Sequence, residues 1–284
     1  MPFRAGLWTD MQALRRSRPI SISYSDCASS MWSLHDETIN IWSHLVAACL
    51  FMHAAVQFMA RHTTAVSRES CAVVLYLLGA TVCFSLSAIY HTFANHRNAG
   101  IWQRMDHFGI AAFIWASSSA FSTLCFARYR ATQHCYMLLL TVLAVLSLCQ
   151  LGVDVTHWAE ISWARVSTHA VFGSLASLPA LHCACNVTRP SSKAQRRLLR
   201  SFWALVALGG IGGAIYATEL LEQVKSTEHS LVGTSHQAMH IFAVAGAWLF
   251  KGGLHSFHAN MMTRNSRRVK QSTTQKARTA PQRR

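Results

Sequence analysis

Long apolar runs separated by short polar segments constrain this chain more than any other feature of its sequence. Each run is about 20 residues long, the length that a helix needs to cross the hydrocarbon core of a bilayer. The runs lie at about residues 37–60, 71–92, 107–127, 134–153, 167–186, 201–221 and 236–257. Only 13% of the residues are charged, whereas about 25% is usual for soluble domains. The pattern predicts an all-α membrane protein, a multi-pass seven-transmembrane helix bundle.

Polar segments flank the seven runs at both ends. Residues 6–18 place apolar side chains at helical spacing before several arginines, which is typical of a short helix on the membrane surface. No cleavable signal peptide is expected in this region. The expected organisation is an amino-terminal segment at 1–36 with this interfacial helix, a transmembrane domain at 37–257, and a basic, disordered tail at 258–284.

Two histidines, His236 and His240, open the last apolar run. Because they are four residues apart, a helix places them on one face, about 6 Å from each other, which suits two ligands of one metal ion. Ionisable residues inside a membrane span are costly and usually functional. The pair alone leaves two readings open, namely half of a zinc site or two hydrogen-bonded side chains at a helix interface.

A third histidine and two further polar residues reach the same membrane face. His91 ends the second run one helical turn after Ser87, and Asp106 opens the third run. An even number of crossings separates these positions from the start of the seventh run, so their side chains can converge at one depth. Three histidines with one open position are the arrangement of a catalytic zinc site, in which water takes the fourth place. We therefore expect zinc to be bound by His91, His236 and His240.

Four motifs distributed over most of the chain also match a known family. They are Ser87-x-x-x-His91, Asp106 followed by Gly109-Ile110, Ser235-His236-x-x-x-His240, and Glu37-Thr38-x-Asn40-Ile41-Trp42-x-His44-Leu45. Together they resemble the progestin and adipoQ receptor family, including its haemolysin-III-like members. The resemblance implies a seven-helix bundle with an intramembrane zinc site, in which the three histidines bind zinc while Ser87 and Asp106 stand near the zinc-bound water.

A zinc ion in this place would act either as a catalyst or as a structural link between helices. Zinc lowers the pKa of a bound water to near 7, which supplies a nucleophile at cellular pH. No carboxylate lies between His236 and His240, so a general base must come from elsewhere. Asp106 is the candidate base, and Ser87 is a candidate to donate to an oxyanion or to orient a ligand. The resemblance implies hydrolysis of a ceramide-like lipid amide.

Three other functions compete with a zinc-dependent lipid amidase. A seven-helix signalling receptor with purely structural zinc is the main alternative, because the resembling family is named for receptors, and a role in lipid or metal homeostasis would suit either reading. Lys251 suggests a retinal protein, but helix rise places it about 16 Å beyond His240. A pore or toxin lacks support, because no recurring pattern of pore-lining charges is evident.

The remaining histidines and the nine cysteines predict no second site. His44 and His169 are each isolated among apolar residues, where a hydrogen-bonded core histidine is the ordinary outcome. The cysteines lie mostly inside apolar runs, which favours buried thiols over a disulfide framework. The net charge of +15 resides largely in the loops and the tail, so the expected partners are membrane lipids with anionic headgroups. No nucleic-acid motif accompanies this charge.

Two criteria disagree over the orientation of the bundle. The loops and tail on the carboxyl-terminal side carry more lysine and arginine than those on the amino-terminal side, so the positive-inside rule favours a cytoplasmic carboxyl terminus. The family resemblance implies a cytoplasmic amino terminus instead, with zinc towards the cytoplasmic leaflet. The sequence leaves the orientation, the organelle and the oligomeric state open.

Overall fold

The described part of the chain is helical, with one isolated β-bridge between Ser21 and His96. This computed structural model describes residues 18–62, 67–153, 163–185, 193–224 and 234–279, with side chains up to residue 264. The predicted all-α class is confirmed for these residues. The interfacial helix expected at residues 6–18 lies outside them, apart from Arg18.

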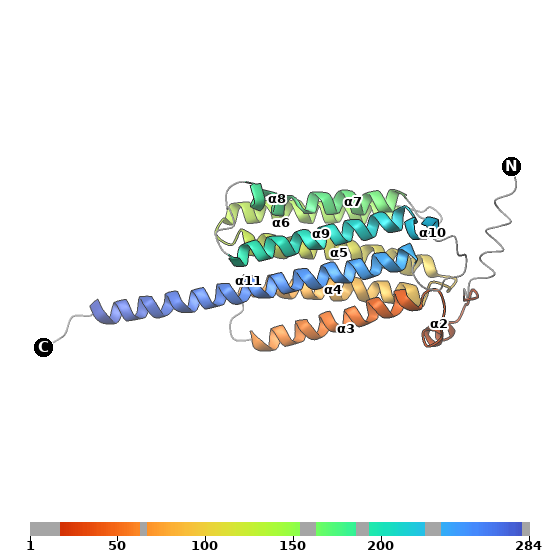
Figure 1. Cartoon of the computed structure of the whole chain (residues 1–284), viewed down its shortest axis with the longest axis horizontal. Helices are drawn as coiled ribbons and strands as arrows, with labels where there is room; N and C mark the ends of the chain where they lie inside the picture. The colour runs from red at the N-terminus through yellow and green to blue at the C-terminus, as the bar shows by residue number, and fades with distance from the viewer. Residues whose placement is uncertain (1–17, 63–66, 154–162, 186–192, 225–233, 280–284) are drawn as a thin grey trace.

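Long helices lie side by side in one bundle (Figure 1). The helices are α2 (Tyr24–Ser30), α3 (Thr38–Arg61), α4 (Arg68–Thr92), α5 (Ala99–Cys125), α6 (Arg130–Val153), α7 (Trp163–Ala176), α8 (Leu178–Cys185), α9 (Lys193–Ala217), α10 (Leu220–Val224) and α11 (Ser235–Thr279). Within the described residues, five helices are long and apolar enough to cross a membrane: α3, α4, α5, α6 and α9. Each coincides with a run that the sequence marked as a span.

The fifth apolar run is broken into α7 and α8. Pro179 stands in the first turn of α8, where it has no N–H to continue the hydrogen-bond ladder of α7 and its ring would clash with a carbonyl of the preceding turn. The break frees the carbonyl of Ala176, and the hydroxyl of Ser118 on α5 donates a hydrogen bond to it. The neighbouring helix thus satisfies a backbone group that the break between α7 and α8 leaves without its helical partner, as a membrane interior requires.

The carboxyl-terminal region differs from the expected disordered tail. Instead of ending near residue 257, α11 continues as a helix to Thr279 and extends beyond the rest of the bundle (Figure 1). Residues 254–280 contain no glycine and no proline, so no local signal ends the helix before Pro281. The low hydrophobicity of this stretch predicted disorder, but helix propensity does not depend on hydrophobicity.

Large aromatic side chains fill the centre of the bundle, where α4 and α11 lie antiparallel. The fully buried ones in the main core are Phe51, Tyr76, Phe84, Phe121, Phe126 and Phe250. The hydroxyl of Tyr76 on α4 donates a 2.6 Å hydrogen bond to the carbonyl of Ala247 on α11, so its polar end is satisfied inside the core. This contact helps fix the register between the two helices that carry the candidate metal ligands.

One glycine of α9 allows this helix to approach α11 closely. A Cβ added at Gly212 would lie 2.9 Å from Cβ of Phe242 and 3.2 Å from Cα of Met239, both on α11. Gly209, Gly210 and Gly213 would meet nothing within 4 Å. Small residues let helices approach closely, and of these four glycines of α9, Gly212 is the one at the α9–α11 interface.

Gly212→Ala is expected to lower the melting temperature by several degrees, because overpacking at a helix interface costs about 1–3 kcal/mol. Gly213→Ala is the matched control: it adds the same methyl group to open space, and alanine favours a helix by about 1 kcal/mol. Thermal unfolding of both variants in detergent measures the difference. Equal melting temperatures would contradict a close approach at Gly212.

Candidate metal centre

Three histidines from two helices meet at one end of the bundle. His91 lies in the last turn of α4, and His236 and His240 lie in the first two turns of α11. One nitrogen from each ring lies within 4.8 Å of the other two, and the ring centroids are 4.7–4.9 Å apart. We call these residues the three-histidine cluster. The cluster can hold a metal ion, as the spacing and sidedness of its residues predicted.

The ring nitrogens of the cluster are better suited to binding a metal ion than to being buried without a hydrogen-bond partner. His91 Nε2 and His240 Nδ1 are buried and have no hydrogen-bond partner among the described residues. Leaving such a nitrogen unsatisfied costs free energy, and buried polar atoms are normally paired. A metal ion between the rings would satisfy these nitrogens, and imidazole nitrogen is a common ligand for zinc, copper, iron and nickel.

Glu37 holds His91 in the orientation that such a site needs. His91 Nδ1–H donates a 2.7 Å hydrogen bond to Glu37 Oε2, which fixes the tautomer and leaves Nε2 as the donor atom for a metal. Asn40 donates to the same oxygen at 2.7 Å. The carboxylate thus accepts hydrogen bonds from two buried side chains.

Arg18 secures the end of α4 that carries His91. Its guanidinium donates to the carbonyls of His91 and Thr92 at 2.6 and 2.8 Å, and to the hydroxyl of Ser30 at 2.9 Å. These carbonyls belong to the last turn of α4, where the helix has unpaired acceptors and a partial negative charge. The segment before α3 is thus attached directly to the metal centre.

The start of α11 is fixed in a similar way by α10. Ser235 opens α11, and both its backbone N–H and its hydroxyl donate to the Glu222 carboxylate, the N–H at 2.7 Å. The Ser235 hydroxyl also accepts a 3.0 Å hydrogen bond from the N–H of Leu221. A carboxylate at a helix N-terminus pairs with its free N–H groups and dipole. These contacts hold the turn of α11 from which His236 projects.

The predicted supporting residues Ser87 and Asp106 lie beside the cluster. Both are buried, and Ser87, one turn before His91 on α4, hydrogen-bonds to the carboxyl group of Asp106 on α5. Asp106 also lies close enough to His91 to interact with it electrostatically, but it is not among the three clustered ligands. The structure therefore brings together all five residues singled out in the sequence.

Two further residues at the centre were missed as site residues. Glu37 appeared only as part of a motif, although the start of its helix lies at the same bundle face as His91. His44, expected as an isolated core histidine, instead stacks on His240 with ring centroids 3.7 Å apart. One sequence signal could have identified both residues, because Glu37, Asn40 and His44 are spaced so that they lie on one face of α3. His169, by contrast, is hydrogen-bonded as expected, with Nε2 3.0 Å from Nδ1 of His107, although it is half-buried and not part of the core.

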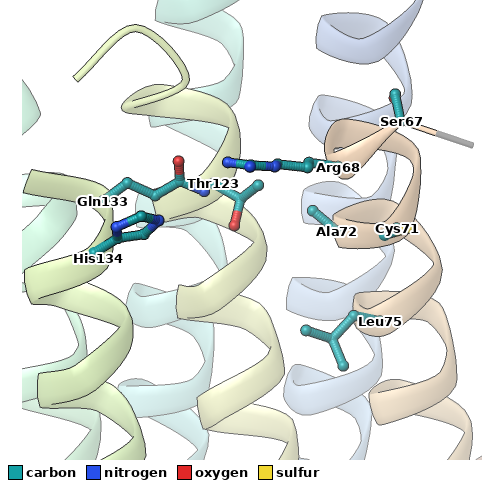
Figure 2. A pocket seen from close by; sticks show the side chains of 8 residues that line it. All are labelled: Ser67, Arg68, Cys71, Ala72, Leu75, Thr123, Gln133 and His134. Carbon is teal, nitrogen blue, oxygen red and sulfur yellow. The ribbon is translucent and has the colours of Figure 1, made fainter. Parts of the chain in front are cut away.

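A pocket of about 620 Å³ opens at the opposite end of the bundle, between the starts of α4 and α6 and the end of α5 (Figure 2). Its lining residues are Ser67, Arg68, Cys71, Ala72, Leu75, Thr123, Gln133 and His134. None of them belongs to the three-histidine cluster or its supporting residues. The residues whose arrangement suits metal-dependent chemistry therefore lie in the three-histidine cluster and not in this open pocket.

The fold and the site together define a class, that of helical membrane proteins with a buried histidine cluster at one end of the bundle. Residues 32–250 match the family described as "Haemolysin-III related". The chain belongs to this family, which confirms the predicted progestin and adipoQ receptor and haemolysin-III-like relationship. It is accordingly an integral, multi-pass membrane protein.

Named relatives come from several organisms. The chain is 26% identical over 243 residues to the adiponectin receptor protein of Drosophila melanogaster, covering 84% of this chain and 54% of that protein. It is 28% identical over 258 residues to progestin and adipoQ receptor-like protein 1 of Caenorhabditis elegans, covering 86% and 57%. Identity to human progestin and adipoQ receptor family member 3 is 27% over 234 residues, covering 77% and 72%. The chain spans about half the length of the first two.

Replacing His91, His236 or His240 singly by alanine is expected to remove most of the bound metal, because each substitution deletes one of three ligands. His53→Ala is the control, since His53 is exposed on α3 and hydrogen-bonded to Gln57. Elemental analysis of purified protein gives the metal content per chain. Full retention of metal in all three variants would rule out the cluster as the site.

Glu37→Ala is expected to weaken metal affinity by about 10- to 100-fold, the usual effect of losing the partner that orients a ligating histidine. Glu69→Ala removes the same type of side chain from the first turn of α4, at the far end of the bundle, and should leave affinity unchanged. Competition with a coloured chelator measures both dissociation constants. Equal affinities would mean that Glu37 does not orient His91 for metal binding.

Proposed function

We propose that this chain crosses the membrane seven times and hydrolyses a lipid amide of the ceramide type at a zinc ion held by the three-histidine cluster. The observation that carries the proposal is the convergence of three imidazoles, two of them buried, with a carboxyl group, Asp106, that is not one of the clustered ligands. A purely structural site has no need of an acid–base group beside it.

Seven crossings follow if α7 with α8, and the first half of α11, are added to the five apolar helices. The stretch from Trp163 to Cys185 is long enough to span a bilayer, because at 1.5 Å per residue it extends about 34 Å. The start of α11 is less apolar than these five helices because it carries His236, Gln237, His240 and Lys251, but it packs closely against α9 at Gly212. The transmembrane domain would then be residues 37–257, as the hydropathy predicted.

Zinc is the metal that we propose for the cluster. Three neutral imidazoles with one open position are the usual protein contribution to a catalytic zinc site, and the family resemblance implies the same metal. Zinc in such a site supplies a water of lowered pKa and polarises a substrate carbonyl. Glu37 contributes by holding His91 in the binding tautomer, and His44 contributes by packing against the ring of His240.

Asp106 is the group that we propose to move the proton. Its carboxylate oxygen would accept a proton from the attacking water and return it to the amine nitrogen as the amide bond breaks, so that one residue serves as base and then as acid. The Ser87 hydroxyl, hydrogen-bonded to Asp106, would hold the carboxyl group in place. Burial of both residues keeps bulk water away from the reaction.

Membrane lipids are the proposed substrate class because the cluster lies among helices that face the bilayer. An amide-linked lipid can enter between helices while its headgroup stays at the interface. The excess of lysine and arginine over acidic residues, 26 against 11, would favour membranes with anionic headgroups. The choice of a ceramide-type amide rests on the family resemblance.

A signalling receptor is the second candidate, and the relatives' names favour it. Two of them are called an adiponectin receptor and a progestin and adipoQ receptor-like protein. In that case zinc would be a structural link between α4 and α11, and a ligand would act by shifting these helices. Binding of a ligand without any turnover of lipid would support the receptor.

Asp106→Asn is expected to retain zinc and fold while reducing amidase turnover by about 100-fold or more, because asparagine cannot accept a proton. Asp36→Asn is the matched control, since it makes the same change at the same end of the bundle, outside the proposed proton path. The quantity to compare is the rate of ceramide hydrolysis per bound zinc.

An unchanged rate per zinc in Asp106→Asn would exclude this residue as the base. Loss of zinc and of thermal stability together, in proportion to the loss of rate, would assign Asp106 a structural role. No hydrolysis by the wild type across a broad panel of ceramides would favour the receptor.

A further inference from the structure

Cys125 and Cys183 bring their sulfur atoms together at the end of the bundle opposite to the three-histidine cluster. Cys125 is the last residue of α5, and Cys183 lies in α8, 58 positions further along the chain. Their Sγ atoms are 2.7 Å apart. Both side chains are buried in the main hydrophobic core. Neither residue takes part in the proposed chemistry.

We propose that Cys125 and Cys183 form a disulfide bond that links α5 to α8. Two non-bonded sulfur atoms ordinarily lie further apart than this pair, while a disulfide bond is about 2.05 Å long. Closing the remaining gap needs only small side-chain movements, because α5 and α8 already pack against each other at this point. The sequence predicted buried thiols instead, because the cysteines lie mostly inside apolar runs.

The surroundings of the two sulfur atoms favour a disulfide bond that forms during folding and is protected afterwards. The side-chain amide of Gln195 on α9 lies 3.9 Å from each sulfur and covers the pair. In the finished bundle an oxidant would reach such buried sulfurs slowly. The bond therefore forms as α8 docks on α5 during folding.

The oxidation is an ordinary thiol–disulfide exchange. The thiolate of one cysteine attacks a low-molecular-weight disulfide and forms a mixed disulfide, releasing one thiol; the second cysteine then attacks the mixed disulfide and releases the other. One Sγ–Sγ bond forms, the bond of the oxidant breaks, and the two protons of the cysteines end on the two thiols released. The protein is oxidised by two electrons, and the oxidant is reduced by two.

A bond at this place would stabilise the least supported part of the bundle. α8 has only eight residues and follows the break at Pro179, so its own hydrogen bonds hold it weakly. The bond would close a loop that contains α6 and α7, and closing a loop of this size lowers the entropy of the unfolded chain.

The proposal also bears on orientation. Disulfides persist in oxidising compartments and are rare in the cytosol. The bond therefore places the cysteine end of the bundle outside the cytosol and the three-histidine cluster towards it. This orientation agrees with the family resemblance and disagrees with the charge bias of the loops. It does not depend on which metal or reaction belongs to the cluster.

The test measures the state of each cysteine in the full chain as cells make it. Intact cells are quenched with acid, and the protein is denatured in excess light N-ethylmaleimide, so that buried thiols also react. After reduction, heavy N-ethylmaleimide labels the sulfurs released from disulfides. Mass spectrometry is expected to find heavy label on Cys125 and Cys183, and light label on the exposed Cys49 and Cys149.

Two single variants separate a specific bond from general oxidation. Cys125→Ser should leave Cys183 with light label, and Cys183→Ser should do the same for Cys125, whereas Cys149→Ser should leave the heavy-labelled pair unchanged. Dithiothreitol should lower the melting temperature of the wild type by about 5–10 °C and leave that of Cys125→Ser unchanged. Light label on both cysteines of the wild type would overturn the proposal and favour the orientation given by the charge bias.

Discussion

The hydrogen bond between the Glu37 carboxylate and His91 Nδ1 is the contact on which the geometry of the metal centre depends. It joins the start of α3 to the end of α4 and fixes which nitrogen of His91 faces the two histidines of α11. In a buried environment such a charge-assisted bond is stronger than at a surface. Without it, the His91 ring would be free to turn its Nε2 away from His236 and His240.

Two other charged side chains hold the helix ends that carry the metal ligands. Arg18 pairs with the last carbonyls of α4, and Glu222 pairs with the first N–H and the hydroxyl of α11, both of Ser235. Both ligand-bearing helix ends are therefore held by a residue of opposite charge to the helix dipole. Between these ends and the far face, aromatic side chains fill the core, and the register that they set decides where the histidines meet.

Local features of the sequence predicted the class and most of the site. The apolar runs gave helices close to those observed, and the sidedness of their ends brought together His91, His236 and His240 with Asp106 and Ser87. Applied to the start of the first run, the same parity argument would have added Glu37. The carboxyl-terminal tail, for which low hydrophobicity predicted disorder, continues α11 as a helix to Thr279; low hydrophobicity says little about helix propensity when glycine and proline are absent.

The sequence by itself determined the membrane class, the approximate spans and the candidate ligands, because hydropathy and helical spacing are properties of neighbouring residues. Only the tertiary structure decided which of four glycines touches α11, that His44 stacks on His240, and that Cys125 meets Cys183. Each of these contacts depends on how a helix is rotated and placed against helices distant in sequence. Rotation and placement are set by the packing of the whole bundle, which no local pattern contains.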